Sequence, residues 1–272
     1  MNELERVSPE RRSEILDALR RGTVPAQSLE LLAVGLERFE TVVDEDLDRV
    51  AGGRGLFKAV RGEYGSGKTF FARWLQERAL AQRFAVTEVQ VSEAETPLHR
   101  LETVYRRLVE RLSTMQDRHG ALRGVVDGWF YTLEEDVLRD QPDLDDEQAL
   151  LHATNQRMEQ KLASVSRSAP AFAACLRAYR TALSEGEREI AEGLLAWLGG
   201  QPNVAARAKR YAGIKGDIDH YGALSFLQGL LIVLRDSGYA GLVWVLDEIE
   251  TLQRVRGDVR DQGLNAIRQL MD

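Results

Sequence analysis

The stretch from Gly62 to Thr69, which reads GEYGSGKT, has the residue types and spacing of a phosphate-binding loop. Its glycines let the backbone turn tightly and approach phosphate oxygens without an intervening Cβ. Successive backbone N–H groups of such a loop point inward, toward the anion. Lys68 would bring a mobile charge to the β- and γ-phosphates of a nucleotide, and the Thr69 hydroxyl would bind Mg²⁺. We expect the nucleotide-binding residues to be Gly62, Glu63, Tyr64, Gly65, Ser66, Gly67, Lys68, Thr69 and Phe70.

A pair of acidic residues could supply the rest of the chemistry. Asp247 and Glu248 follow five apolar residues, Leu242 to Leu246, a run that is typical of a strand buried on both faces of a parallel sheet. Ligands of open α/β sheets bind beyond the C-terminal ends of the strands, which is where this pair would lie. We therefore predict that Asp247 is a metal ligand, directly or through water. Glu248 is the predicted catalytic residue, which accepts a proton from an attacking water.

The segments around the loop must position it. The apolar residues Leu56–Val60 predict a short strand before the loop, and the pattern from Thr69 to Gln82 predicts a helix after it. The segment Phe84–Val91 is rich in β-branched residues and predicts a second strand. Apolar residues at helical spacing predict an amphipathic helix over Pro97–Met115. Strand, glycine loop and helix in this order are the context that a phosphate-binding loop requires.

The chain divides into four parts in this interpretation. Residues 1–53 are expected to form a helical lead-in, with Ser8 as the N-cap of its first helix. Residues 54–115 hold the first part of the core, and residues 222–272 hold the second part with the acidic pair. Residues 116–221 show helical periodicity without a convincing strand, which predicts a large all-helical insertion. The insertion would explain why the two motifs are so far apart in sequence.

The composition is that of an ordinary globular protein, with 44% hydrophobic and 29% charged residues. No apolar run approaches the ~18 residues of a membrane span. The N-terminal residues are charged where a signal peptide is apolar, which predicts a cytoplasmic protein. The single cysteine, Cys175, lies in the apolar stretch AFAACLRAY and is expected to pack in the core rather than to react.

The net charge of −7 argues against nucleic-acid binding over the whole surface. A local basic cluster leaves a DNA contact open, although a solvated charged face is the simpler interpretation. The residues of this cluster are Arg207, Lys209, Arg210 and Lys215.

The sequence segments that surround the two motifs resemble those of a known group of proteins. They include GTVP and VGLERF before the loop, FKAVRGEYGSGKTFFARWLQERAL around it, and LRDSGYAGLVWVLDEIETL around the acidic pair. They are similar to bacterial P-loop ATPases of the additional-strand class, which contains the AAA+ and STAND ATPases. More narrowly, they resemble the BrxD family of ATP-binding proteins from BREX phage-defence systems. The residues that match and carry over are Lys68, Thr69, Asp247 and Glu248.

The resemblance implies an α/β fold with a P-loop parallel-sheet core, ATP and Mg²⁺ as cofactors, and a cytoplasmic ATPase in an antiviral system. Its implied partners are other phage-defence proteins, often including a helicase. In this class a fourth strand lies between the first and the third. Because only one helix is predicted after the acidic pair, we expect the core to be truncated and the 272 residues to be a fragment. The alternative is that a partner chain or an unusual strand pairing fills the gap. An arginine from a neighbouring subunit of a homo-oligomer is expected to complete the site.

Three functions remain open. The chain is expected to be an ATP-dependent motor or switch, a non-hydrolysing nucleotide-dependent scaffold or regulatory protein, or a DNA-binding adaptor. Two positions have two interpretations each. Ser92 either hydrogen-bonds Glu248 or only caps the end of the second strand. The apolar residues Val34 and Leu36 either contact adenine, as the resemblance implies, or pack in the core.

Overall fold

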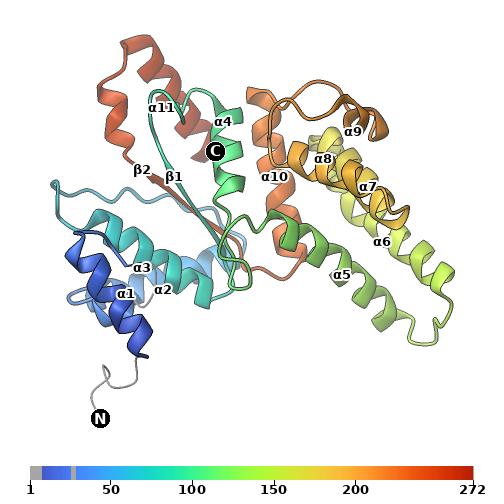
Figure 1. Cartoon of the computed structure of the whole chain (residues 1–272), viewed down its shortest axis with the longest axis horizontal. Coiled ribbons are helices and arrows are strands. Elements are labelled where there is room, and N and C mark those ends of the chain that lie inside the picture. Colours follow the sequence, from blue (N-terminus) through green and yellow to red (C-terminus); the bar gives the residue numbers. More distant parts are fainter. Residues whose placement is uncertain (1–7, 26–28, 272) are drawn as a thin grey trace.

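The computed structural model shows a largely helical molecule with one two-stranded parallel sheet near its centre (Figure 1). It describes residues 8–25 and 29–271. In chain order the elements are α1 (Pro9–Arg20), the 3₁₀ helix η2 (Leu29–Leu31), α2 (Glu37–Ala51), α3 (Lys68–Ala81), β1 (Ala85–Gln90), α4 (Leu101–Glu110), α5 (Leu122–Asp140), α6 (Glu147–Ser168), α7 (Pro170–Ser184), α8 (Arg188–Leu198), α9 (Ala206–Tyr211), α10 (His220–Asp236), β2 (Leu242–Asp247), the 3₁₀ helix η3 (Ile249–Gln253) and α11 (Gly257–Met271).

The lead-in begins as the sequence predicts. The Ser8 hydroxyl accepts a hydrogen bond from the backbone N–H of Arg11 at 3.3 Å, and Pro9 is the first residue of α1. Both features favour a helix start. The hydroxyl accepts from an N–H that has no partner within the helix, and proline has no backbone N–H that would need one. The helix α2 ends at Gly52 and Gly53, and Gly53 has a φ of 94°, a value that favours glycine.

The strands β1 and β2 pair in parallel over their whole lengths, with Ala85 opposite Leu242 and Gln90 opposite Asp247. The ladder continues one step further, because the N–H of Val91 donates to the carbonyl of Asp247 at 2.9 Å. Both strands therefore end at the same edge of the sheet. The acidic pair and the loop that follows β1 share this edge.

The predicted strand from Leu56 to Val60 was wrong. The segment is irregular, and the side chains of Leu56, Phe57 and Val60 are 45%, 52% and 55% exposed. A strand needs a neighbour for its backbone N–H and C=O groups. In the described part of the chain β1 occupies one edge of β2, and no strand occupies the other. For the same reason β2 is only half-buried along its length, not buried on both faces. The described part of the chain thus contains a two-stranded parallel sheet among helices, which is smaller than the predicted P-loop core.

The helix α4 is shorter than the predicted helix over Pro97–Met115, although the predicted apolar stripe is correct. The chain turns before the helix, where the N–H of Arg100 donates to the carbonyl of Pro97. After the helix, Ser113 pairs with Val86 of β1 instead of continuing the helix. The stripe residues that are buried are Leu98, Leu101, Val104, Tyr105, Leu108 and Leu112.

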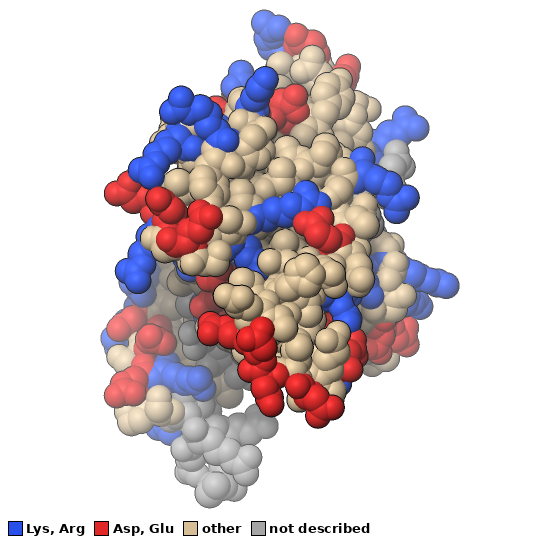
Figure 2. Space-filling view, turned by 90° about the vertical axis from the view of Figure 1, so that its right-hand side faces the viewer, with Lys and Arg blue, Asp and Glu red and all other residues tan. Residues whose placement is uncertain are grey.

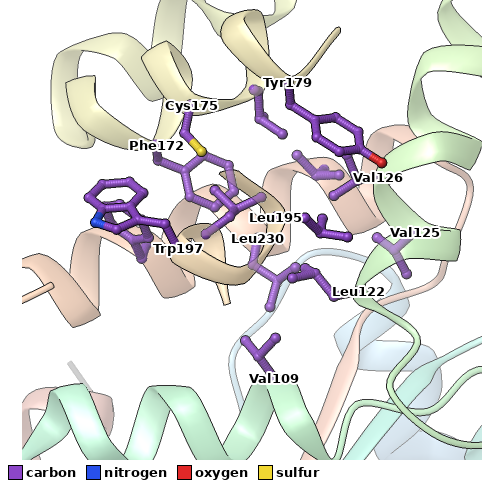
Figure 3. Packing of buried hydrophobic residues seen from close by; sticks show 14 of the residues in the cluster. Val109, Leu122, Val125, Val126, Phe172, Cys175, Tyr179, Leu195, Trp197 and Leu230 are labelled. Carbon is purple, nitrogen blue, oxygen red and sulfur yellow. The ribbon is translucent and has the colours of Figure 1, made fainter. Parts of the chain in front are cut away.

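The helices α5 to α9 and α10 form the part of the molecule that we call the helical unit, and α4 packs against it (Figures 1 and 3). Residues 116–221 contain helices and no strand, as predicted. Figure 3 shows side chains from α4, α5, α7, α8 and α10 meeting in one core; the labelled ones are Val109, Leu122, Val125, Val126, Phe172, Cys175, Tyr179, Leu195, Trp197 and Leu230. Burial raises the pKa of the Cys175 thiol, which favours the packing interpretation of this cysteine.

Within the ranges that the structure describes, no helix combines the length and the apolar character needed to cross a bilayer.

Candidate functional site

The loop from Gly62 to Gly67 joins an irregular segment to α3. Its backbone geometry explains why glycine occupies three of its positions. Gly65 and Gly67 have φ values of 79° and 89°, in the left-handed region that residues with a Cβ avoid. At Gly62 a Cβ would lie 2.4 Å from the Ser66 hydroxyl oxygen, which is too close. Gly67 is also the residue before the first turn of α3. The loop therefore leads directly into the N-terminus of a helix, where backbone N–H groups have no partner within the helix and can bind an anion.

The side chain of Lys68 lies over this loop. Its Nζ donates to the carbonyl oxygens of Gly62 and Glu63, at 3.0 and 3.1 Å. Among the described residues, neither Asp247 nor Glu248 makes an ion pair with this ammonium group. The lysine thus satisfies two carbonyls of its own loop, and its charge lies over that loop.

The acidic pair lies at the C-terminal end of β2 as predicted, with Asp247 as the last residue of the strand, and the backbone of Glu248 is unusual. Asp247 is half-buried at the end of the strand, and Glu248 is exposed. Glu248 has a φ of 58°, a left-handed conformation that is uncommon for a residue with a side chain. The N–H of Glu248 donates to Oδ1 of Asp247 at 2.9 Å, and the carbonyl of Glu248 accepts from the N–H of Thr251. The pair is therefore held in a tight turn that leads into η3.

The fold brings the loop and the acidic pair to the same end of the sheet. The helix α3 ends a few residues before β1 begins, and it packs along both strands. One contact between α3 and β1 is the hydrogen bond from Gln76 to the Glu88 carboxylate, at 2.8 Å. Since α3 runs back along the strands, its start at Lys68 lies toward the edge where Asp247 ends β2. Figure 1 shows the start of α3 and the end of β2 on the left-hand side of the view.

The donor atoms in this region are suited to a hydrated cation. In the described part of the chain, the Thr69 hydroxyl and the second carboxylate oxygen of Asp247 have no hydrogen-bond partner. Hydroxyl and carboxylate oxygens are the ligands that Mg²⁺ prefers. The predicted metal ligands thus retain free oxygen atoms.

An apolar hollow of about 470 Å³ lies beside the start of α3. Its lining residues come from α1, the GTVP turn, the residue after η2, and α3, and they are Leu19, Gly22, Thr23, Val24, Pro25, Leu32 and Phe70. Arg73 of α3 fixes one wall, since its Nη1 donates to the carbonyl of Val24 at 2.8 Å. Phe70 follows Thr69 directly, so the hollow adjoins the loop. In the sequence alone, GTVP stood out only as part of the family resemblance.

The hollow does not include Val34 or Leu36, the residues for which an adenine contact was one of two interpretations. Val34 is 90% exposed and lines no part of it. Leu36 packs against the core formed by α2 and α3. The packing interpretation of Leu36 is therefore the one that the structure favours. The other ambiguous residue, Ser92, caps a turn: its hydroxyl accepts from the N–H groups of Glu95 and Thr96, both at 3.1 Å. The simple strand-end interpretation of Ser92 is therefore correct.

The lead-in is anchored to α3 by polar contacts. The Arg78 guanidinium donates to both carboxylate oxygens of Asp44 on α2, at 2.6 and 2.5 Å. This contact lowers the pKa of the Asp44 carboxyl and raises the pKa of Arg78. The Glu77 carboxylate accepts from the N–H of Leu29 at 3.1 Å. These contacts fix the lead-in, and with it the wall of the hollow, to the helix that follows the loop.

The basic cluster of the helical unit is partly neutralised. Arg207 pairs with Glu187 and Lys209 pairs with Asp217, both at 3.1 Å, while Arg210 and Lys215 are exposed. Figure 2 shows the face of the molecule on this side, where basic and acidic side chains are interspersed and acidic ones gather at the lower edge. Because two of its four charges are paired, this cluster would attract DNA less strongly than four unpaired basic residues would.

Comparison with known proteins adds to this geometry. The sequence model of the family described as BREX system ATP-binding protein BrxC/D matches residues 7–272. The chain belongs to the BrxC/D family. The match includes the glycine loop, the acidic pair and the helical unit between them, so the predicted resemblance to BrxD is confirmed. No curated protein and no solved structure gave a match. The description of the BrxC/D family thus assigns ATP binding and the BREX system.

Proposed function

We propose that this BrxC/D-family protein binds Mg-ATP at the loop Gly62–Thr69 and hydrolyses it as a motor or switch of BREX phage defence. The observation that supports this best is the placement of Lys68. It lies at the glycine-capped start of α3 and toward the same edge of the sheet as Asp247. A helix N-terminus, a lysine and a carboxylate in this order are the parts from which P-loop enzymes build a nucleotide site.

The loop would hold the triphosphate by exchange of hydrogen bonds. Lys68 Nζ leaves the carbonyls of Gly62 and Glu63 and donates to phosphate oxygens, which are stronger acceptors because they are charged. The free N–H groups at the start of α3 donate to the same anion. Phosphate binding therefore replaces contacts that the loop already makes.

The hollow beside Phe70 would hold the adenine base. Its walls are mainly apolar, as a flat aromatic ring requires, and it adjoins the loop through Phe70. The Thr23 hydroxyl donates to the carbonyl of Ala18 at 3.1 Å, so it is already engaged as a donor. The N–H groups of Gly22 and Thr23 and the carbonyl of Val24 are already engaged, so the N–H of Val24 and the carbonyls of Gly22 and Thr23 would be the polar contacts that select the base.

The acidic pair and Thr69 would organise Mg²⁺ and water. The Thr69 hydroxyl and the free oxygen of Asp247 would hold the cation, whose charge offsets that of the phosphates. Glu248 is exposed, so its carboxylate is free to accept a proton from the attacking water. An arginine from a neighbouring copy of the chain would stabilise the charge on the transferred phosphoryl group.

A non-hydrolysing scaffold is the second candidate. The observation that favours it is the small sheet, in which β2 is half-exposed and the Leu56–Val60 segment is unpaired. A phosphate-binding loop on such a support would still attract ATP, while the alignment that in-line attack requires would be harder to hold.

Equilibrium binding of Mg-ATP tests the proposal. The parent is expected to bind, and Lys68→Ala is expected to lose measurable binding. Lys215→Ala is the matched control, because this lysine is exposed in the helical unit and far along the chain from the loop. Unchanged affinity in Lys68→Ala would show that the loop is not the nucleotide site. Phosphate release by the parent then separates the enzyme from the scaffold, which binds ATP without turnover.

A further inference from the structure

Two adjacent residues at the end of α10 reach toward different parts of the molecule. Arg235 donates from Nη1 and Nη2 to the carbonyl oxygens of Val50 and Ala51, at 3.5 and 3.1 Å. Asp236 accepts from Nζ of Lys161 on α6, at 3.2 Å between the nitrogen and Oδ1. One contact leads to the helix before the phosphate-binding loop, and the other leads into the helical unit.

The Arg235 contact closes the end of α2. The last carbonyls of a helix have no partner within it, and together they carry a partial negative charge. The forked guanidinium donates to two of them at once, which a lysine ammonium does less well. The carbonyl of Ala51 gains a partner in this way, while that of Val50 also accepts from the N–H of Gly53 at 2.8 Å. Directly after them the chain enters Gly52 and Gly53, and a Cβ at Gly53 would lie 3.9 Å from Nη1 of Arg235. The segment that leads from α2 to the loop thus begins in contact with this arginine.

The exposed segment between α2 and α3 has one further anchor of this kind. Lys58 forms an ion pair with Asp46, which is also on α2. Both anchors therefore fix the segment to the same helix, and Arg235 joins the end of that helix to α10. A shift of α10 relative to α2 would move the start of the segment that carries Gly62 to Gly67.

The helix α10 is tightly held in the helical unit. It buries Phe226, Leu230, Val233 and Leu234, and it contacts α4, α5, α6 and α7. Its Gly229 allows a close approach, since a Cβ there would lie 2.8 Å from the ring of Phe172 on α7. Figure 3 shows Leu230 within this core. Because packed interiors resist small displacements, α10 moves with the helical unit.

The same helix leads directly to the acidic pair. After Asp236 the chain turns at Gly238, whose φ is 82°, and enters β2 a few residues later. The turn is fixed to the start of β1, since the N–H of Ala240 donates to the carbonyl of Arg83 at 2.9 Å. The helix α10 is thus connected through the chain to β2, which ends in Asp247. Through Arg235 it also contacts the end of α2, where the segment that leads to Lys68 begins.

We infer that Arg235 is a positioning residue that couples nucleotide binding at the loop to the helical unit. The inference rests on the proposed function, because the effector is the nucleotide bound there. When the loop rearranges around the triphosphate, the end of α2 and Arg235 transmit the change to α10 and its neighbours. Coupling of this kind is reciprocal, so a ligand of the helical unit would change the affinity for ATP by the same factor.

Hydrogen exchange of the whole chain, with and without Mg-ATP, tests the coupling. In the parent we expect Mg-ATP to protect residues 54–67 and also to change the exchange of α5 to α8. In Arg235→Ala we expect protection of residues 54–67 to persist, an ATP affinity about 5-fold lower, and no change in α5 to α8. Arg235→Lys should recover part of the change, since it keeps the charge without the fork.

The control is Arg188→Ala, which removes an exposed arginine of α8 whose side chain has no partner among the described residues. It should behave as the parent. If Mg-ATP changes α5 to α8 equally in Arg235→Ala and the parent, or in neither, the coupling is refuted while the proposed function stands. If residues 54–67 of the parent gain no protection, the proposed function fails first. Should Arg235→Ala not fold, Arg235→Gln and Arg235→Lys carry the same comparison.

Discussion

The carboxylate of Asp247 accepts a hydrogen bond from the backbone N–H of Glu248, with 2.9 Å between Oδ1 and the nitrogen. The bond fixes Glu248 in a left-handed conformation with a φ of 58°. A residue with a Cβ adopts this conformation at a cost of about 1–2 kcal/mol. Strain of this kind is tolerated at functional sites, where it sets the direction of a side chain.

This strain predicts that stability and activity separate at position 248. Glu248→Gly relieves the conformational cost, and Glu248→Ala removes the carboxylate but retains the cost. We expect the glycine variant to be about 1 kcal/mol more stable than the alanine variant by chemical denaturation, and both to be inactive. Equal stabilities would show that the left-handed turn is absent in solution.

The role of Glu248 as a proton acceptor predicts a specific defect in Glu248→Gln. The amide keeps the size of the side chain but does not accept the proton of water. We expect phosphate release to fall by a factor of about 100 or more, with ATP affinity unchanged. Glu250→Gln, an exposed acid two residues later, is the control and should release phosphate at the parental rate. A similar loss in both variants would assign the effect to η3 and not to the acid.

The short distance from Gly62 to Ser66 predicts a loop variant with a rescue. In Gly62→Ala the new methyl group would lie 2.4 Å from the Ser66 hydroxyl oxygen, so the loop must shift and ATP affinity should fall. Adding Ser66→Ala removes that oxygen and should restore part of the affinity, as measured by calorimetry. Gly55→Ala is the control, because no atom lies within 4 Å of a Cβ there. Lack of rescue would indicate that a backbone feature other than this contact requires glycine.

The hollow predicts a variant that distinguishes the base from the phosphates. Phe70→Ala removes an aromatic wall, and we expect ATP affinity to fall about 10-fold, which corresponds to the ~1.4 kcal/mol of one order of magnitude. Affinity for inorganic tripolyphosphate should be unchanged, because the loop is intact. A parallel loss for both ligands would mean that Phe70 supports the loop and not the base.

The contact between Asp44 and Arg78 predicts a pH dependence of stability. Because Arg78 lowers the pKa of the Asp44 carboxyl, the pair stabilises the protein above the ordinary carboxyl pKa of about 4. This contribution is lost as the pH falls through the lowered pKa. Asp44→Asn should therefore be less stable than the parent at pH 7, by at most about 1 kcal/mol for so exposed a pair. The difference should vanish on acidification, and a constant difference would exclude the ionic contribution.

The helices were predictable from sequence because their signals are local. Ser8 and Pro9 mark the start of α1, and the apolar spacing from Leu101 to Leu108 marks the buried face of α4. The glycine loop was predictable for the same reason, since Gly65 and Gly67 occupy positions that their backbone angles require. Local propensity and the final conformation agree at these places.

The remaining features depend on contacts between distant segments. The Leu56–Val60 segment has the composition of a strand, but a strand forms only where a neighbour offers a ladder, which no local pattern reveals. The hollow joins the GTVP turn to Phe70 across dozens of residues, and Arg235 reaches Val50 from the other half of the chain. Neither pairing leaves a periodic signal in one sequence.

The burial of Cys175 has a practical consequence. It is the single cysteine of the chain, and its thiol lies in an apolar core with a raised pKa, so maleimide dyes will not react with it in the folded protein. Tyr64, by contrast, projects fully into solvent from the tip of the glycine loop. A fluorophore attached through Tyr64→Cys would therefore label one defined position and follow the arrival of a ligand in real time.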